Sequence, residues 1–216
     1  MNMNQQAAAR LSRLVATAVS VLALGACGSL RPAAALPPAF YALDSARTAA
    51  AVTAPATAPT LIISPPRAAS GFDSQRIIYM RLPHKLDYFS HSEWIDPPAR
   101  MLGPLLLAAL ENTGTFRAVV LTPGTAAGDL RLDTEIIRLQ HEFLGSPSRV
   151  HFTLRATLVD DKSRHVLAWR EFDGFETASS EDPYGGVVAA NRAVQTVLDK
   201  LSAFCAEVAL TLPVEK

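Results

Sequence analysis

The sequence predicts an α+β domain with two layers, in which a mostly antiparallel β-sheet packs against two amphipathic helices. Three observations predict it. Short β-rich runs fill the first part of the domain, three longer β runs separated by turn residues form a C-terminal meander, and two segments carry apolar residues at steps of three and four. The order of these segments shows no βαβ alternation, which argues against a nucleotide-binding Rossmann fold.

Composition limits the classes of protein that the 216-residue chain can form. Apolar residues make up 49% and charged residues 19%, so the chain can build a core and global disorder is not expected. The 20 basic and 20 acidic residues give no net charge, and a neutral chain lacks the basic field of a nucleic-acid binder. Two cysteines, Cys27 and Cys205, are too few for a multi-cysteine zinc site or a disulfide framework.

Residues 1–26 have the order of a signal peptide. Two arginines precede an apolar run over residues 14–23, which falls short of the roughly 20 apolar residues that span a bilayer. The sequence Leu24-Gly25-Ala26-Cys27 follows and resembles the lipobox of bacterial lipoproteins. This resemblance implies cleavage between Ala26 and Cys27 and acylation of Cys27, and two or three acyl chains anchor a protein stably at a membrane. The alternative is an ordinary cleaved signal with an incidental cysteine.

Lipidation has consequences for Cys205 and for localisation. An acylated Cys27 cannot pair with Cys205, and a lone thiol in an oxidising compartment is expected to be buried, here on a helix face. Gly28 follows the cysteine. In well-studied enteric bacteria an aspartate at this position retains lipoproteins at the inner membrane. Gly28 therefore favours the periplasmic side of the outer membrane, with the inner membrane as the alternative.

Residues 27–60 form the predicted tether, and residues 61–212 the predicted domain. The tether is rich in Ala, Pro and Thr and carries few charges, so it cannot bury enough apolar surface to offset its ordering entropy. The run Phe40-Tyr41-Ala42-Leu43 interrupts it and could dock as an edge strand at 40–43. The first domain strands are expected at residues 61–63 and 77–80, with residues 86–89 as the hairpin partner of the latter.

The first helix is expected to begin at Pro97 and Pro98, with Asp96 as its N-cap. Apolar residues at helical spacing follow as far as Leu110, and the turn residues 112–114 end the helix. The last helix is expected over residues 183–210. It has one apolar stripe that contains Cys205 and a single polar member, Asn191.

Between the helices lie a strand at residues 116–121 and the meander, with strands at residues 129–143, 149–159 and 165–175. Residues 150–158 alternate between apolar and polar side chains, which is typical of a sheet buried on one side. The apolar pattern of the preceding strand changes phase at Ile136-Ile137, which predicts a β-bulge. The connections at residues 145–148 and 160–163 are expected to be hairpin turns.

Catalytic and metal-binding motifs are not found in the sequence, so we expect no catalytic site, no metal and no cofactor. His141, His151 and His165 fall on successive strands and could form a metal cluster. We expect instead that they lie on a solvated face of the sheet. The pair Asp160-Asp161 is interpreted as turn chemistry.

Trp169 is expected to pack in the sheet or core. Glu93-Trp94, just before the first helix, is the better candidate for a partner contact, and the alternative is packing that fixes the start of the helix.

Several segments between residues 71 and 116, in this order, resemble the ABC-type transport auxiliary lipoproteins, a family that includes paraquat-inducible protein C. They are Gly71-Phe72-Asp73-Ser74, Ile78-Tyr79, Leu86-Asp87-Tyr88-Phe89, Glu93-Trp94, residues 98–102 and residues 110–116. The lipobox and the run at 40–43 also fit the N-terminus of this family.

The resemblance implies a non-catalytic periplasmic lipoprotein that assists an ABC transporter of the Mla or mammalian-cell-entry (MCE) type in lipid transport between the inner and outer membranes. Its implied partners are the MCE-domain protein, the permease and the ATPase. Acylated Cys27 would hold the membrane, phospholipid is a further candidate ligand, and a homo-oligomeric ring is a candidate assembly. Phe40, Tyr41, Glu93 and Trp94 are the candidate contact residues.

Two other functions are kept as alternatives. One is an outer-membrane assembly or envelope-maintenance lipoprotein that acts as a protein-interaction module. The other is a periplasmic hydrolase using residues such as His84, Asp87 and His91, although these residues form no recognised arrangement of nucleophile and base.

Overall fold

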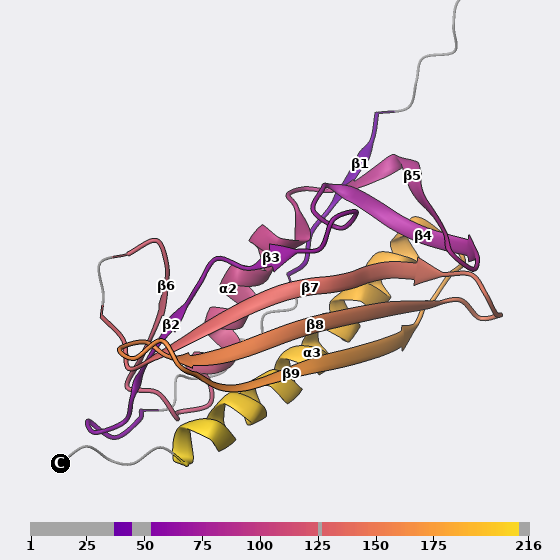
Figure 1. The fold of residues 1–216 in the computed structure, drawn as a ribbon. Coiled ribbons are helices and arrows are strands. Elements are labelled where there is room, and N and C mark those ends of the chain that lie inside the picture. Colours follow the sequence, from indigo (N-terminus) through magenta and orange to yellow (C-terminus); the bar gives the residue numbers. More distant parts are fainter. Residues whose placement is uncertain (1–36, 45–52, 125–126, 212–216) are drawn as a thin grey trace, which may run out of the picture. The chain divides into compact units, whose positions relative to one another are not determined.

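The computed structural model describes residues 37–44, 53–124 and 127–211, drawn in colour in Figure 1. The chain divides into two compact units, Met1–Pro37 and Pro38–Lys216. The signal peptide, Cys27 and Gly28 lie outside the described residues. The second unit contains the elements β1 (Ala39–Tyr41), β2 (Thr60–Ile63), β3 (Arg67–Ala68), β4 (Arg76–Leu82), β5 (Lys85–Trp94), α2 (Pro98–Glu111), β6 (Ala118–Leu121), β7 (Leu130–Glu142), β8 (Arg149–Asp160), β9 (Val166–Thr177) and α3 (Pro183–Leu210).

The long strand β7 organises one mixed, open sheet of nine strands. On one side it pairs with β8, which pairs with β9, and both pairings are antiparallel. On its other side β2, β3 and β4 follow one another along its length, each parallel to it. Strand β6 then adds to β2, β5 adds to β4 as an antiparallel hairpin, and β1 adds to β5. The long pairings are antiparallel, as predicted, whereas the short strands join in parallel.

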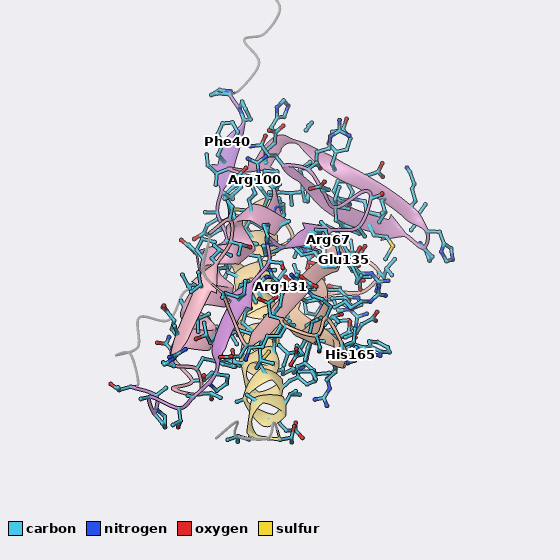
Figure 2. The ribbon with its side chains drawn as sticks, turned by 60° about the vertical axis from the view of Figure 1, so that its left-hand side comes forward. Phe40, Arg67, Arg100, Arg131, Glu135 and His165 are labelled. Carbon is cyan, nitrogen blue, oxygen red and sulfur yellow. The ribbon has the colours of Figure 1, made fainter. Side chains whose placement is uncertain are left out.

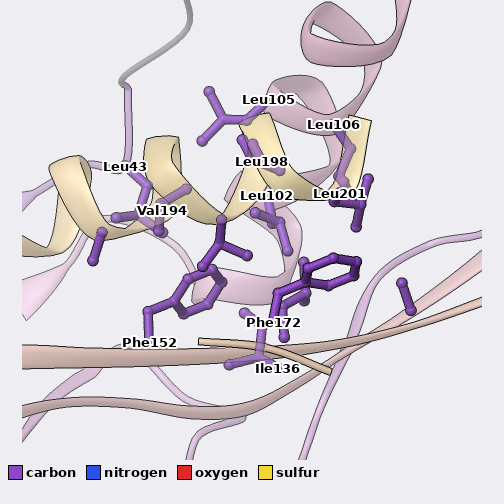
Figure 3. Close-up of a cluster of buried hydrophobic side chains, with 14 of the residues drawn as sticks. Leu43, Leu102, Leu105, Leu106, Ile136, Phe152, Phe172, Val194, Leu198 and Leu201 are labelled. Atoms are coloured by element: carbon purple, nitrogen blue, oxygen red, sulfur yellow. The ribbon is translucent and has the colours of Figure 1, made fainter. Parts of the chain in front are cut away.

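Both helices lie on one face of this sheet and confirm the two-layer α+β architecture (Figure 1). Helix α3 packs against β8 and β9, and α2 packs against β6 and touches α3. Between the layers lies one continuous cluster of buried apolar side chains (Figure 3). Ten of its members are labelled there: Leu43, Leu102, Leu105, Leu106, Ile136, Phe152, Phe172, Val194, Leu198 and Leu201. Burial of this apolar surface is the main force that holds the layers together.

The predicted β-bulge lies where the apolar pattern changes phase. The register between β7 and β8 shifts between Ile136 and Arg138. Before the shift Leu132 and Ile136 face the helices, and after it Leu139 does. The extra residue therefore keeps apolar side chains on the helix-facing side along a 13-residue strand.

The alternation of β8 is confirmed on its apolar side only. Phe152, Leu154 and Leu158 are completely buried beneath the helices. On the opposite side, which we call the open face, a solvated surface was expected, but His151 and Thr153 are also buried. The reason is that longer side chains from neighbouring strands lie over them, as described below.

Both helices lie where the sequence predicts them, but the N-cap of the first one differs from the prediction. Helix α3 has the predicted bounds, and Cys205 on its inner stripe is fully buried, which raises the pKa of its thiol to about 12. Helix α2 is capped by Pro97 without a side-chain hydrogen bond, so the expected N-cap at Asp96 is wrong. Asp96 instead pairs with Arg100, one turn along the helix, at 3.2 Å.

Trp169 is the largest error among the predicted core residues, because it is 65% exposed. It lies on β9, the last strand of the sheet, where only β8 is a strand neighbour. Its side chain is on the open face, opposite Thr157, and α2 and α3 both lie on the other face of the sheet (Figure 1). The apolar side chain of Trp169 therefore did not indicate that the residue is buried, because it lies on an edge strand.

Candidate partner-binding site

The predicted contact residues come together at one edge of the sheet. Strand β1 runs parallel to β5 with Phe40 opposite Glu93 and Tyr41 opposite Trp94. Phe40 is 53% exposed, and Figure 2 shows it at the end of the domain remote from His165. An edge strand was expected at 40–43, and β1 forms one over residues 39–41, whereas Leu43 leaves the strand and is buried in the core.

Trp94 differs from the other three, because its indole is buried in the core. Its side chain offers no contact surface, and it serves the packing role that was weighed as the alternative for Glu93-Trp94. Phe40, Tyr41 and Glu93 keep exposed atoms and remain predicted contacts.

Three elements contribute exposed apolar side chains around the end of β1. Tyr41 forms a ring contact with Tyr184 of α3, with ring centroids 6.4 Å apart. The backbone N–H of Ile95 donates to the Tyr41 carbonyl oxygen at 2.7 Å. Tyr184 and Ile95 are more than half exposed. We call Phe40, Tyr41, Ile95 and Tyr184 the edge patch, and aromatic residues of this kind are enriched in protein interfaces.

Asn191 fastens the segment after β1 to helix α3. Its side-chain amide nitrogen donates to the Ala42 carbonyl oxygen at 3.1 Å, and its Oδ1 accepts from the backbone N–H of Asp44 at 2.9 Å. Between them, Leu43 inserts into the core. The sequence signal for this contact was present, because Asn191 is the single polar member of an apolar stripe, but its partner nearly 150 residues away was not predictable.

A second feature, missed in the sequence, is a buried serine–histidine pair at the ends of the β7–β8 turn. Nε2 of His141 lies 2.8 Å from Oγ of Ser148, and both residues are almost fully buried. Burial lowers the pKa of His141, and Glu181 and Asp182 oppose this effect only in part. Nδ1 of His141 has no hydrogen-bond partner, and an added Cβ on Gly186 would meet it.

The pair does not have the geometry of a hydrolytic triad. In a triad the carboxylate holds the imidazole. Here the Glu181 carboxylate accepts from the backbone N–H of Ser148 at 2.8 Å, so it orients the serine end of the turn. Ser148 is also completely buried, which denies substrate access to its hydroxyl. The arrangement pins the turn against the start of α3.

The open face carries a second polar cluster, centred on His151. Nδ1 of His151 lies 3.0 Å from Nη1 of Arg138 and 3.3 Å from Oε1 of Glu142, and Nε2 lies 2.7 Å from Oδ1 of Asp173. Thr153 donates its hydroxyl proton to the same carboxylate at 2.6 Å. The Thr153 bond is the largest cause of the lowered pKa of Asp173. With its proton committed to Asp173, Thr153 is not an activated nucleophile.

Neighbouring groups complete this cluster and cover it. Burial is the largest single influence on the pKa of Glu142 and would raise it. Hydrogen bonds from Gln140 and Arg149, together with the charges of His151 and Arg149, outweigh burial and lower it. The Phe175 ring stacks over His151 with centroids 4.0 Å apart, and the Arg149 guanidinium lies over Phe175. Satisfied buried networks of this kind specify strand register.

The other candidate residues are placed apart. His141 faces the helices, His151 lies on the open face and His165 is exposed at the β8–β9 turn, so no metal site unites them. Among the described residues, no group of three or more potential ligands forms a metal site. Asp160 caps the turn by accepting from Ser163, which confirms the turn interpretation. In the described part of the chain, no helix is both long and apolar enough to cross a membrane.

Comparison with known proteins gives one family and a set of similar folds. The sequence model of the ABC-type transport auxiliary lipoprotein component family matches residues 41–202. No curated protein sequence matches the chain.

Among solved structures, a DUF330 protein from Xanthomonas campestris is 25% identical and has a TM-score of 0.68. The alignment covers 79% of this chain and 96% of that one. A hypothetical protein from Chlamydia trachomatis is 8% identical with a TM-score of 0.50, and the alignment covers 71% and 98% of the two chains. This second likeness is one of fold alone.

Proposed function

Because the chain belongs to the family of ABC-type transport auxiliary lipoprotein components, we propose that it serves its transporter as a non-catalytic adaptor that holds and positions other components. The observation that carries this proposal is the edge patch. Exposed aromatic side chains lie at an open sheet edge, and Asn191 fixes the adjoining segment to the body of the domain. A partner bound at the edge patch would therefore be held by the whole domain, through the hydrogen bonds between Asn191 and residues 42–44.

The polar clusters support a non-catalytic role. The hydroxyl of Ser148 is enclosed, and that of Thr153 is committed to a carboxylate. Both clusters join strands or turns to one another, which is a structural use of histidine and carboxylate side chains. His84, Asp87 and His91 belong to the exposed β4–β5 hairpin, where Asp87 pairs with Lys85 at 3.4 Å.

The anchor in this proposal is Cys27, acylated after cleavage behind Ala26. It lies outside the described residues and rests on the lipobox alone. With Gly28 as the next residue, the acyl chains would sit on the periplasmic side of the outer membrane. Strand β1 begins twelve residues after Cys27, so the edge patch is the part of the domain nearest to the anchor along the chain.

The proposed partners are the MCE-domain protein, the permease and the ATPase of an ABC transporter that moves lipid between the inner and outer membranes. The edge patch is the proposed contact surface for the MCE-domain protein. Pairing of β1 with a different sheet edge of the next protomer would be a heterologous contact, and such contacts generate a homo-oligomeric ring where they close.

Cavity size favours positioning over lipid carriage within the domain. The cavity between the sheet and α3, lined by residues such as Ile77, Leu139 and Ala190, has a volume of about 10 Å³. Small-molecule sites typically enclose about 300–1,000 Å³. This cavity could hold one water molecule and not an acyl chain. A phospholipid would instead bind at a surface, such as the hollow of about 330 Å³ at the β7–β8 turn that Leu144 and Arg149 line, or between protomers.

The test is affinity purification from detergent-solubilised membranes, followed by protein and lipid mass spectrometry. The wild-type chain is expected to recover an ATPase, a permease and an MCE-domain protein. Phe40→Glu is expected to lose them, whereas Trp169→Glu, which changes another exposed aromatic residue at the opposite edge of the sheet, is expected to keep them.

Two outcomes would contradict the proposal. Recovery of only outer-membrane assembly or envelope-maintenance factors would favour that alternative class of lipoprotein. Equal recovery of the transporter with Phe40→Glu and with wild type would show that the edge patch is not the contact.

A further inference from the structure

A group of exposed apolar side chains lies away from the edge patch, where the β4–β5 hairpin and the β7–β8 turn end. Leu82 is 61% exposed, and Leu86, Tyr88 and Leu144 are each nearly half exposed. We call these four residues the tip patch. None of them is used by the adaptor function proposed above.

The two turns that carry the tip patch are joined to each other. The backbone N–H of Phe143 donates to the Met80 carbonyl oxygen at 2.8 Å, which brings Leu144 beside the end of β4. Across the hairpin Met80 is opposite Leu86, so Leu86 lies on the next strand along. Figure 1 shows the hairpin tip and the β7–β8 turn at the same end of the sheet.

Basic side chains surround this apolar group. Residues 80–86 contain Arg81, His84 and Lys85 and no acidic residue, and residues 81–86 are all exposed. The Arg81 guanidinium lies 4.8 Å from the centre of the Phe143 ring, and Arg76 lies 4.1 Å from that of Tyr88.

The carboxylates near the tip are engaged. Glu181, which interacts with the charge of Arg81, accepts from the backbone N–H of Ser148 at 2.8 Å, and Asp182 accepts from that of Gly185 at 2.7 Å. Asp87 pairs with Lys85 at 3.4 Å, and Glu142 pairs with Arg149 at 3.0 Å. Within the hairpin tip itself, residues 80–86, positive charge exceeds negative charge.

We propose that the tip patch is a membrane-contact site that inserts its leucines between the headgroups of a bilayer containing anionic lipid. Apolar residues on two adjoining turns can enter the headgroup region while the backbone stays outside the hydrocarbon. The long Arg81 and Lys85 side chains can then keep their charges at the level of the lipid phosphates. Tyrosine is enriched at this same depth.

Charge favours a bilayer over a protein partner at this surface. Lysine is depleted in the buried centres of protein interfaces, whereas a cation beside an anionic membrane surface adds affinity. The inference is independent of the transporter and of acylation at Cys27. The domain would touch a membrane with its own residues, at a surface distinct from its anchor.

The test uses an environment-sensitive dye attached to a single cysteine in the full-length chain. Cys27→Ser removes one natural thiol, and the other, Cys205, is buried with a pKa of about 12 and does not react. The dye is placed by Leu86→Cys in one protein and by Val166→Cys in a control, where Val166 is 59% exposed at the far end of the sheet. Both are mixed with vesicles of phosphatidylethanolamine and phosphatidylglycerol that contain a spin-labelled quenching lipid.

The dye at position 86 is expected to be quenched severalfold more than the dye at position 166. The difference should shrink in phosphatidylcholine vesicles and in high salt. Lys85→Glu removes one charge and adds its opposite, so it should weaken binding to anionic vesicles by about fivefold or more. Leu82→Ser should weaken it by about tenfold, and Val166→Ser should not.

Three results would overturn the proposal. They are a dye at position 86 that stays in water, one that is quenched no more than the dye at position 166, and one that is shielded only when the solubilised transporter is added. The last result would assign the tip patch to a protein partner. Because the vesicle test contains no transporter, its failure would leave the adaptor proposal standing, and failure of the purification would leave this one standing.

Discussion

Replacement of Asn191 by alanine tests how the domain holds the segment that follows β1. The change removes the bonds to the Ala42 carbonyl oxygen and to the Asp44 N–H, at 3.1 and 2.9 Å. An intramolecular hydrogen bond contributes about 0.5–1.5 kcal/mol, and partly exposed bonds lie at the lower end. We therefore expect a loss of about 1–2 kcal/mol, concentrated in residues 39–44.

The assay is hydrogen–deuterium exchange of peptides that cover residues 37–44. A loss of about 1–2 kcal/mol corresponds to exchange that is about 5- to 30-fold faster through local opening. The melting temperature should fall by a few degrees at most, because about 1 kcal/mol shifts it by about 2–4 °C in a domain of this size.

Two controls separate the contact from a general effect on α3. Asn191→Asp keeps an acceptor for the Asp44 N–H and removes the donor to Ala42, so it should give an intermediate rate. Gln195→Ala, one turn further along the same helix, should leave exchange unchanged. Equal protection of residues 39–44 in Asn191→Ala and wild type would refute the reasoning.

Three further predictions concern packing and pH. Gly174→Ala should lower the free energy of unfolding by about 1–3 kcal/mol, because the added Cβ would lie 2.7 Å from the Ala193 backbone oxygen. Urea titration measures this loss, and Gly145→Ala is the control that should be nearly neutral, since its Cβ would meet nothing within 4 Å. Phe152→Ala should cost about 3–5 kcal/mol because the ring is fully buried, and a loss below about 1 kcal/mol would mean that the site collapses or is not core. Burial lowers the pKa of His141 below its ordinary 6.5, so the unfolded chain binds the proton first. The stability from neutral His141 is therefore complete above pH 6.5 and is lost as the pH falls through the lower folded-state value, with a slope of at most about 1.4 kcal/mol per pH unit. His141→Asn should flatten the pH dependence of stability, measured by urea denaturation, below pH 6.5, and an unchanged slope would contradict this account.

Local patterns in the sequence were sufficient to predict most of the fold. The bounds of α3, the hairpin of β4 and β5, the meander and the bulge near Ile136 all follow from periodicity and turn residues, which act over a few neighbours. The parallel placement of β2, β3 and β4 beside β7 was not predicted, because strand order depends on contacts between distant residues.

The candidate site was predictable only in part for the same reason. The aromatic residues of the run at 40–43 were sufficient to predict an edge strand. The sequence also indicated Phe40 and Glu93 as contact residues, but not that they are opposite each other in the sheet. The predictions for the two tryptophans were the reverse of what the structure shows. Trp94, expected at a contact surface, is buried, and Trp169, expected in the core or sheet, is exposed. Residue type does not report position within the sheet, and only the observed order of strands explains both outcomes.

Buried polar groups were the least predictable part. His141 and Ser148 flank a turn, but nothing in their spacing shows that both point inward toward α3. His151 was expected on a solvated face, and its burial depends on side chains of β7 and β9 that are brought over it by register. Register over three strands is a tertiary property.

The most direct test of the adaptor proposal is photo-crosslinking in native membranes, with a benzophenone amino acid in place of Phe40 and, as the control, in place of Trp169. The account predicts that position 40 crosslinks to the MCE-domain component of the transporter and that position 169 does not. Crosslinks from position 40 to outer-membrane assembly factors alone, or the same products from both positions, would contradict it.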